Sequence, residues 1–219
     1  MKRALLALVL LITLLALAGC GDDHVSAPPT VVTQILSDVA FDGDIARNAQ
    51  TGALTVTQGN TQSVFVGIDP ATGAELRGFL DFPLSGAGGV PGNAIIQSAI
   101  LDIFINSIAP QPLIGTIPIR IDLVSFQPPT LVGNDFDRTL QPALATTTIT
   151  PPISQADFGQ HVAVNVTRLM VEAQRQGLAN FQLRILQELG PGIPGLIEIN
   201  DTTGGNRPTL APLLEVTYF

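Results

Sequence analysis

Apolar and polar residues alternate with a period of two through most of the chain beyond residue 34. In the segment 117–124, IPIRIDLV, Ile119 and Ile121 fall on one side, and Arg120 and Asp122 fall on the other. Such alternation is typical of a β-strand with one buried face. The same period predicts strands in 98–108, 161–166 and 181–186, and shorter ones in 63–68, 77–82, 196–199 and 213–218.

Segments rich in glycine and proline separate the predicted strands. They include DPATG, SGAGGVPG and GPGIPG, all of which favour turns. Many strands joined without intervening helices favour an antiparallel arrangement over a parallel sheet. The pattern therefore predicts an all-β fold, an antiparallel sandwich or barrel, over residues 34–219.

One segment has the spacing of a helix. In TRLMVEAQRQG, Leu169, Met170 and Ala173 share one helical face. Thr167 is suited to the N-cap, and Gly177 is suited to the position after the C-cap. The pattern predicts one short helix, at about residues 167–176, which would close one end of the sandwich.

The amino-terminal residues have the pattern of a secretion signal. Lys2 and Arg3 precede an apolar run over 4–18 that contains a single polar residue. A run of about 15 residues is shorter than a membrane span and matches the apolar region of a signal peptide. We expect 1–19 to be a cleaved signal peptide and the proline-containing stretch 20–33 to be a flexible tether.

The single cysteine, Cys20, follows the apolar run directly. The residues LAGC resemble the lipobox of bacterial lipoproteins. That resemblance implies that Cys20 receives a diacylglyceryl group, that the chain is cut before it, and that acyl chains anchor the protein in the membrane. Because Gly21 stands where an aspartate would favour the inner membrane, the resemblance implies an exported protein on the outer membrane.

Charge narrows the range of partners. The whole chain has a formal net charge of −8, and without 1–19 it keeps eight arginines, no lysine and 18 acids, a net charge of −10. Nucleic acids and anionic membrane surfaces attract the opposite sign. We therefore expect no nucleic-acid partner, and membrane contact only through the lipid on Cys20.

Four segments resemble the DNRLRE-type domains, which are extracellular β-sandwich modules similar in fold to jelly-roll carbohydrate-binding modules. The segments are RGFLDFPL, NAIIQSAILDIFI, VAVNVTRLMVEAQRQGLANFQLRI and NRPTLAPLLEVTYF. The likeness spans residues 36–219 and implies an antiparallel jelly-roll-like β-sandwich with a carbohydrate-binding-like role. The chain departs from the family in its lack of tryptophan and in the stretch 127–160, which matches little.

A protein surface that binds sugars usually presents an exposed aromatic ring to the face of a pyranose. Since the chain has no tryptophan and one tyrosine, phenylalanine would supply most such rings. The candidates are Phe126, Phe136, Phe158 and Tyr218. The alternative for each is packing in the core or at a sheet edge.

Spaced carboxylates indicate a candidate calcium site. Asp42 and Asp44 lie two residues apart in FDGDI, and Ca²⁺ takes six to eight oxygen ligands. Other loops would have to contribute, so Asn200 and Asp201 join them as candidate ligands of a structural calcium ion. The alternative is a polar turn, and no other cofactor is expected.

Motifs for catalysis are absent from the sequence. Neither HExxH nor GxSxG occurs, and GAGGVP lacks the third glycine of a dinucleotide loop, which predicts a connection between strands. His161 begins a predicted strand, where an edge role is the simpler interpretation. Asp81, Asp102 and Asp122 could form a glycosidase carboxylate pair, but charge on a solvated sheet face explains them more simply.

Together these observations predict a lipid-anchored, non-catalytic protein of the cell envelope that binds a polysaccharide or another surface polymer. The alternative is a structural or assembly lipoprotein that docks on another envelope protein, which the apolar, lysine-free composition favours. A glycosidase or esterase is the third hypothesis. It would require Asp81, Asp102 and Asp122 to meet in one concave pocket.

Overall fold

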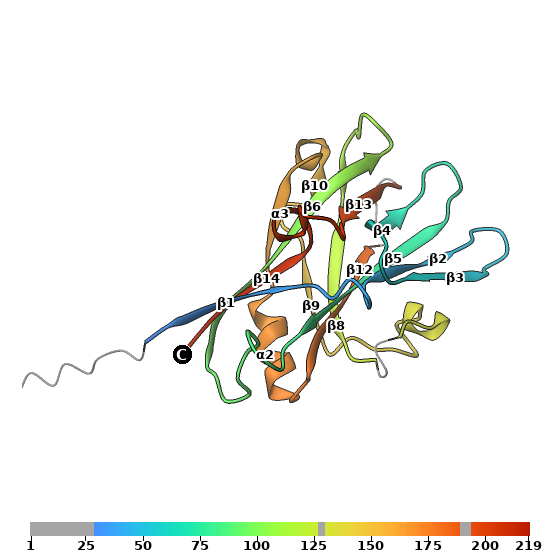
Figure 1. The fold of residues 1–219 in the computed structure, drawn as a ribbon. Helices are drawn as coiled ribbons and strands as arrows, with labels where there is room; N and C mark the ends of the chain where they lie inside the picture. The colour runs from blue at the N-terminus through green and yellow to red at the C-terminus, as the bar shows by residue number, and fades with distance from the viewer. Residues whose placement is uncertain (1–28, 127–129, 189–193) are drawn as a thin grey trace, which may run out of the picture.

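The computed structural model describes residues 29–126, 130–188 and 194–219, and β-strands dominate it (Figure 1). The strands are β1 (Val31–Leu36), β2 (Gly43–Arg47), β3 (Leu54–Gln58), β4 (Ser63–Ile68), β5 (Glu75–Pro83), β6 (Ile96–Ala109), β7 (Thr116–Ile117), β8 (Ile119–Val124), β9 (Ala145–Thr148), β10 (Ile153–Ser154), β11 (His161–Asn165), β12 (Asn180–Gln187), β13 (Leu196–Asn200) and β14 (Leu213–Tyr218). The helical segments are short: η1 (Gly133–Phe136), η2 (Gln155–Asp157), α2 (Thr167–Arg175) and α3 (Arg207–Leu210). Within the described ranges, no helix has the length and apolar character needed to cross a membrane.

Twelve of the described strands form one large curled sheet in the order β1-β14-β6-β13-β4-β5-β12-β8-β9. Strand β11 pairs with β6, and the β2–β3 hairpin pairs with β5. All of these pairs are antiparallel, and β7 and β10 form a separate small antiparallel sheet. The prediction of an antiparallel all-β chain is therefore confirmed.

Strand β6 connects two parts of the large sheet. Its first half pairs with β14 through 96–102 and with β11 through 100–104, and its second half pairs with β13 through 105–109. In Figure 1, β1 and β14 extend from one side of the molecule toward the C terminus, and the β2–β3 hairpin projects from the opposite side. The first strand begins at Val31, so the last residues of the expected tether belong to the sheet.

The main hydrophobic core lies on the inner face of the curled sheet. The period-two pattern places the same residues there that the sequence predicts, because alternate side chains of a strand point to opposite faces. On β6 these include Leu101 and Ile103, on β8 Ile121, and on β12 Leu183 and Ile185. All five are fully buried, so strands from both ends of the sheet share one core.

A second, smaller cluster forms on the outer face of β2, β5 and β8, beneath residues 130–144. We call these residues the covering segment. Two of its side chains pack against the outward-facing residues of the three strands and the residues that follow β8. The cluster consists of Ile45, Phe79, Val124, Phe126, Leu131 and Phe136.

The covering segment also buries an arginine of β12. Arg184 is fully buried, and its Nη2 donates to Asp122 Oδ2 on β8 at 2.9 Å. Its Nη1 donates to the main-chain carbonyls of Asp135 and Gln141, at 2.9 and 3.0 Å, both in the covering segment. Arg138 of the same segment pairs with Asp122 at 3.3 Å. Each charge is therefore matched where water is excluded, as buried ions require.

A second arginine of this face is held in a similar way. Arg77 of β5 donates through Nη1 to the main-chain carbonyl of Phe136 and through Nε to Glu75 Oε1 at 2.8 Å. Its guanidinium lies 3.9 Å from the centre of the Phe136 ring, a distance that suits a cation–π contact. Arg47 lies 5.1 Å from the centre of the same ring, so two cations are close to Phe136.

These contacts correct one sequence-based interpretation. Asp81 and Asp122 were expected on a solvated sheet face, but they are 1% and 0% exposed. Asp122 is buried because the covering segment lies over it and over its arginine partners. Asp81 is buried beneath the side chains of Asn180 and Gln182 and the connection between β1 and β2, where Asp38 donates its N–H to the Asp81 carbonyl. In β5 and β8, the charged positions of the alternation therefore mark a second buried face, on the outer side of the sheet.

The predicted helix is present as α2, and Leu169, Met170 and Ala173 face the core as expected. The expected N-cap is wrong by one residue, since Val166 occupies the cap position and Thr167 begins the helix. The Thr167 hydroxyl instead accepts a hydrogen bond from the N–H of Ala99 at 2.9 Å, which ties α2 to β6.

Replacing Arg184 with alanine should lower the free energy of unfolding by about 3–5 kcal/mol, because the change leaves buried acceptors and part of the Asp122 charge unmatched. Urea unfolding followed by circular dichroism measures this change. Arg175→Ala removes an exposed arginine of α2 and should leave the urea midpoint nearly unchanged. Equal losses in the two variants would contradict the assignment.

Gly78 of β5 provides a test of core packing. A Cβ atom built there would lie 2.7 Å from Val64 Cγ1 and 2.7 Å from Val66 Cγ2, so Gly78→Ala should cost about 1–3 kcal/mol through overpacking. Gly92→Ala is the matched control, because a Cβ there meets nothing within 4 Å. A Gly78→Ala protein as stable as the control would show that β4 and β5 are not packed this closely.

Candidate ligand-binding face

The outer side of β6 presents a row of polar and aromatic side chains. Because Leu101, Ile103 and Ile105 point into the core, Asp102 and Phe104 point outward. A bulge at the next position leaves Asn106 outward as well. The neighbouring strands add His161 from β11 and Glu198 from β13. We call Asp102, Phe104, Asn106, His161 and Glu198 the β6 face.

One end of the β6 face is an aromatic and acidic group. The rings of Phe104 and His161 meet edge to face, with centroids 5.1 Å apart and an interplanar angle of 70°. Asp102 Oδ2 lies 2.9 Å from His161 Nδ1. The imidazole is therefore fixed from two sides, yet 48% of the His161 side chain stays exposed. The other Asp102 oxygen, Oδ1, has no hydrogen-bond partner.

The other end of the β6 face is centred on Glu198. Its carboxylate accepts hydrogen bonds from Ser63 Oγ at 2.5 Å, Ser107 Oγ at 2.7 Å and Asn106 Nδ2 at 2.8 Å. Burial would raise the pKa of Glu198, but these hydrogen bonds outweigh it and hold the pKa below its usual value. Glu198 is therefore an ordered anion at neutral pH.

The charges around the β6 face have one sign. Strands β1, β6, β11, β13 and β14 contain no arginine or lysine, and their acids are Asp102, Glu198 and Glu215. The arginines within strands all belong to β2, β5, β8 and β12. The two parts of the sheet therefore differ in charge, and the β6 face is the acidic part.

Two of the four predicted aromatic candidates are wrong. Phe126 and Phe136 are 6% and 4% exposed, because both pack in the cluster beneath the covering segment. Tyr218 is half-buried at the end of β14 and packs against the main core. Phe158 is 42% exposed, and the following residue, Gly159, donates its N–H to Ile105 of β6 at 2.8 Å. The chain at Phe158 therefore runs beside Ile105 of β6.

The sequence prediction missed Phe104, although its signal was present. Phe104 occupies a polar position of the alternation in SAILDIFINSI, between Asp102 and Asn106. An aromatic residue in the outward register of a strand predicts an outward ring, and Phe104 is half-buried in the structure.

Asp81, Asp102 and Asp122 do not meet in one pocket. Asp81 accepts hydrogen bonds from Asn180 and Gln182 on β12, and Asp122 pairs with arginines beneath the covering segment. Asp102 lies on the β6 face instead. The arrangement required for a carboxylate pair of the glycosidase type is therefore absent from these three residues.

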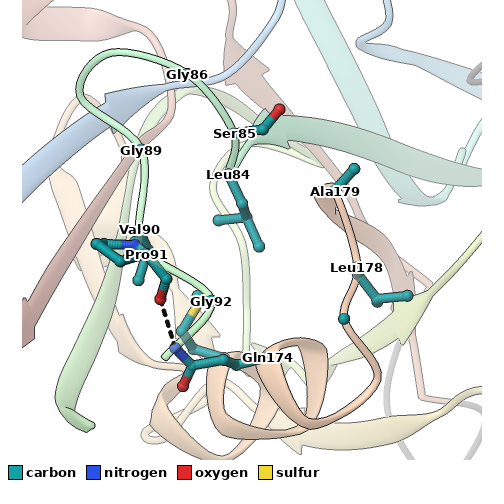
Figure 2. A pocket seen from close by; sticks show the side chains of 12 residues that line it. Leu84, Ser85, Gly86, Gly89, Val90, Pro91, Gly92, Gln174, Leu178 and Ala179 are labelled. Carbon is teal, nitrogen blue, oxygen red and sulfur yellow. Dashed lines mark hydrogen bonds between the residues drawn. The ribbon is translucent and has the colours of Figure 1, made fainter. Parts of the chain in front are cut away.

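A pocket of about 410 Å³ lies between the glycine-rich β5–β6 connection and the end of α2 (Figure 2). Gln174 Nε2 donates to the carbonyl of Pro91 at 2.9 Å and joins the two walls. Ser85 and Gln174 supply the polar side chains, and none of the lining residues is titratable. The GAGGVP segment connects two strands, as predicted, and gives this pocket no catalytic group.

Of the four residues predicted to bind calcium, the structure brings two together. Asp42 and Asp201 lie side by side inside the protein, and each affects the charge of the other. Asp44 instead accepts from the N–H of Phe65 at 3.3 Å, and Asn200 accepts from the N–H of Thr202 at 3.0 Å, so neither joins them. Cys20 lies outside the described residues.

In the described part of the chain, no three or more His, Cys, Asp or Glu side chains form a metal-binding group. A comparison with protein-family models found no match, and a comparison with curated proteins found none either.

The environment of Glu198 predicts a pH dependence of stability. Because its folded pKa lies below the usual value, the ionised group stabilises the protein above the unfolded pKa, about 4.3. That contribution disappears as the pH falls through the lower folded value. Glu198→Gln should therefore lose less stability than the parent protein between pH 6 and pH 3, as measured by urea midpoints at both values. Parallel losses in the two proteins would contradict the prediction.

Proposed function

We propose that this chain is a non-catalytic lipoprotein of the cell envelope that binds polysaccharide through the β6 face. The observation that carries the proposal is the outward ring of Phe104, set on a strand among Asp102, Asn106 and His161. A strand that presents an aromatic ring beside fixed hydrogen-bonding groups suits a sugar chain, since the ring packs on a pyranose and the polar groups bind its hydroxyls.

The amino-terminal motif supports the envelope location. The LAGC lipobox would place a lipid on Cys20 and hold the protein at the outer membrane. Ten residues, 21–30, separate Cys20 from Val31, where the first described strand begins. A tether of that length would let the sheet lie close to, but outside, the lipid surface.

The architecture supports a jelly-roll-like sandwich related to DNRLRE-type domains. Strands β6 and β14 from one part of the curled sheet and β8 and β12 from another contribute to a single core. The segment that matches the family least, 127–160, includes the covering segment. The strands that match the family better include β6, which carries the proposed binding face.

The charge of the β6 face indicates which polysaccharides would bind. Asp102 and Glu198 are acidic, and the surrounding strands β1, β6, β11, β13 and β14 offer no arginine or lysine. Polymers that carry carboxylate, sulfate or phosphate groups would be repelled. We therefore propose neutral or amino-bearing polysaccharides as the ligand class.

A binding screen of the purified protein in a mild detergent tests the proposal. Neutral and amino-bearing polysaccharides should bind saturably, and anionic ones should not. Phe104→Ala should weaken binding at least about tenfold, the loss expected when a stacking ring is removed. Val171→Ala, on the exposed side of α2, is the control and should bind as the parent does. No binding to any polysaccharide, or unchanged binding by Phe104→Ala, would overturn the proposal.

The exposed edge of β3 favours a second function, docking on another envelope protein. Within the described residues β3 pairs with β2 alone, and Leu54 and Val56 are 42% and 39% exposed. An edge strand of this kind can accept a strand from a partner. A cysteine introduced at Val56 should then form a specific cross-link in intact cells, and one at Ile114, which is 81% exposed, should not. Equal labelling at both positions would count against docking.

A further inference from the structure

Three buried oxygen atoms without hydrogen-bond partners lie together near the carboxyl end of β13. They are Ser37 Oγ, Asp42 Oδ2 and Asp201 Oδ2. Ser37 and Asp42 come from the connection between β1 and β2, and Asp201 directly follows β13. The three residues are 3%, 0% and 0% exposed, so water does not reach their side chains from outside.

The other oxygens of the two carboxylates have partners that fix their positions. Asp42 Oδ1 accepts from the N–H of Asp81 at 2.8 Å. Asp201 Oδ1 accepts from Arg207 Nη1 at 3.1 Å. The two carboxyl groups lie close enough to affect each other, and Ser37 lies against Asp42. Buried polar atoms left in this way call for a ligand.

The charge of the cluster also calls for a cation. Arg207 is the cation that pairs with Asp201 here, and Asp38 adds a further negative charge close to Asp81 and Asp201. Two fully buried carboxylates, Asp42 and Asp201, therefore lie near a single arginine.

We propose that Ser37, Asp42 and Asp201 bind a hard divalent cation of the calcium class. All three donors are oxygens, and no histidine or cysteine belongs to the cluster, which argues against zinc and copper. Ca²⁺ accepts carboxylates, hydroxyls, main-chain carbonyls and water in a flexible shell. The three side chains would supply part of that shell.

Such an ion would join three segments that are distant in sequence. Asp42 bonds to β5 through Asp81, and Asp201 leads through Arg207 back to the main-chain carbonyl of Ser37. The cation would therefore hold the β1–β2 connection against β5 and against the segment that precedes α3. Its role would be in stability, and it does not depend on the β6 face.

Thermal unfolding of the purified protein in a mild detergent tests the site, with Ca²⁺ and with EDTA. At a hundredfold excess of Ca²⁺ over its Kd, the unfolding temperature should rise by at least about 5 °C over that in EDTA. Asp201→Asn and Asp42→Asn should remove the Ca²⁺-dependent rise. Asp44→Asn is the matched control, because Asp44 is a buried acid of the same segment outside the cluster, and it should keep the rise.

A second measurement does not depend on the folding of a variant. The parent protein is treated with EDTA, and Ca²⁺ binding to it is then measured by isothermal titration calorimetry. Saturable binding with one ion per chain supports the proposal. The absence of both heat and thermal shift in the parent protein would overturn it. A more stable Asp42→Asn protein, with no response to Ca²⁺ in the parent, would also overturn it and would show that the two carboxyls share a proton.

Discussion

The structure depends on β6, because this strand pairs with different neighbours along its two halves and contributes side chains to both faces of the sheet. One strand of 14 residues pairs with β14 and β11 along its first half and with β13 along its second half. Its inner side chains belong to the main core, and its outer side chains form the proposed binding face. Because successive residues of a strand face opposite ways, the register that buries Leu101 and Ile103 also fixes the outward position of Phe104. A slip of one residue would destroy both.

The distribution of arginine follows from a different constraint. Arg77 and Arg184 lie in strands whose outer face is buried, so each must be matched by carboxylates and carbonyls. The strands supply the carboxylates of Glu75 and Asp122, and the covering segment supplies the main-chain carbonyls. As a result, the positive charge of the strands is neutralised on one part of the sheet, and the acidic β6 face lies on the other. The proposed preference for uncharged or amino-bearing polymers follows from this separation.

The sequence allowed the helix α2, most of the core and the strands β4, β5, β6, β8, β11, β12, β13 and β14 to be predicted, because they follow from local periodicity. The strands β1, β2, β3, β9 and β10 were not predicted. Ile121, Leu183 and Leu169 are buried as their spacing indicates. The covering segment was not predictable, since its contacts join residues about 40 to 60 positions apart and its own sequence has no period. For that reason the sequence left Phe126 and Phe136 as candidate exposed rings, with core packing as the alternative. Likewise, Asp42 and Asp201 meet only through the fold, so spacing could suggest them but could not exclude Asp44 and Asn200.

The covering segment is held largely through its main chain. Arg184 binds the carbonyls of Asp135 and Gln141, and Arg77 binds the carbonyl of Phe136. A carbonyl group is the same in every amino acid, so these bonds place little demand on which side chains the segment carries. Over evolution, the two arginines of the strands should therefore change slowly, together with Leu131, Phe136 and Arg138, whose side chains contact the sheet. The other positions of the covering segment are free to diverge while the way the segment is attached stays the same.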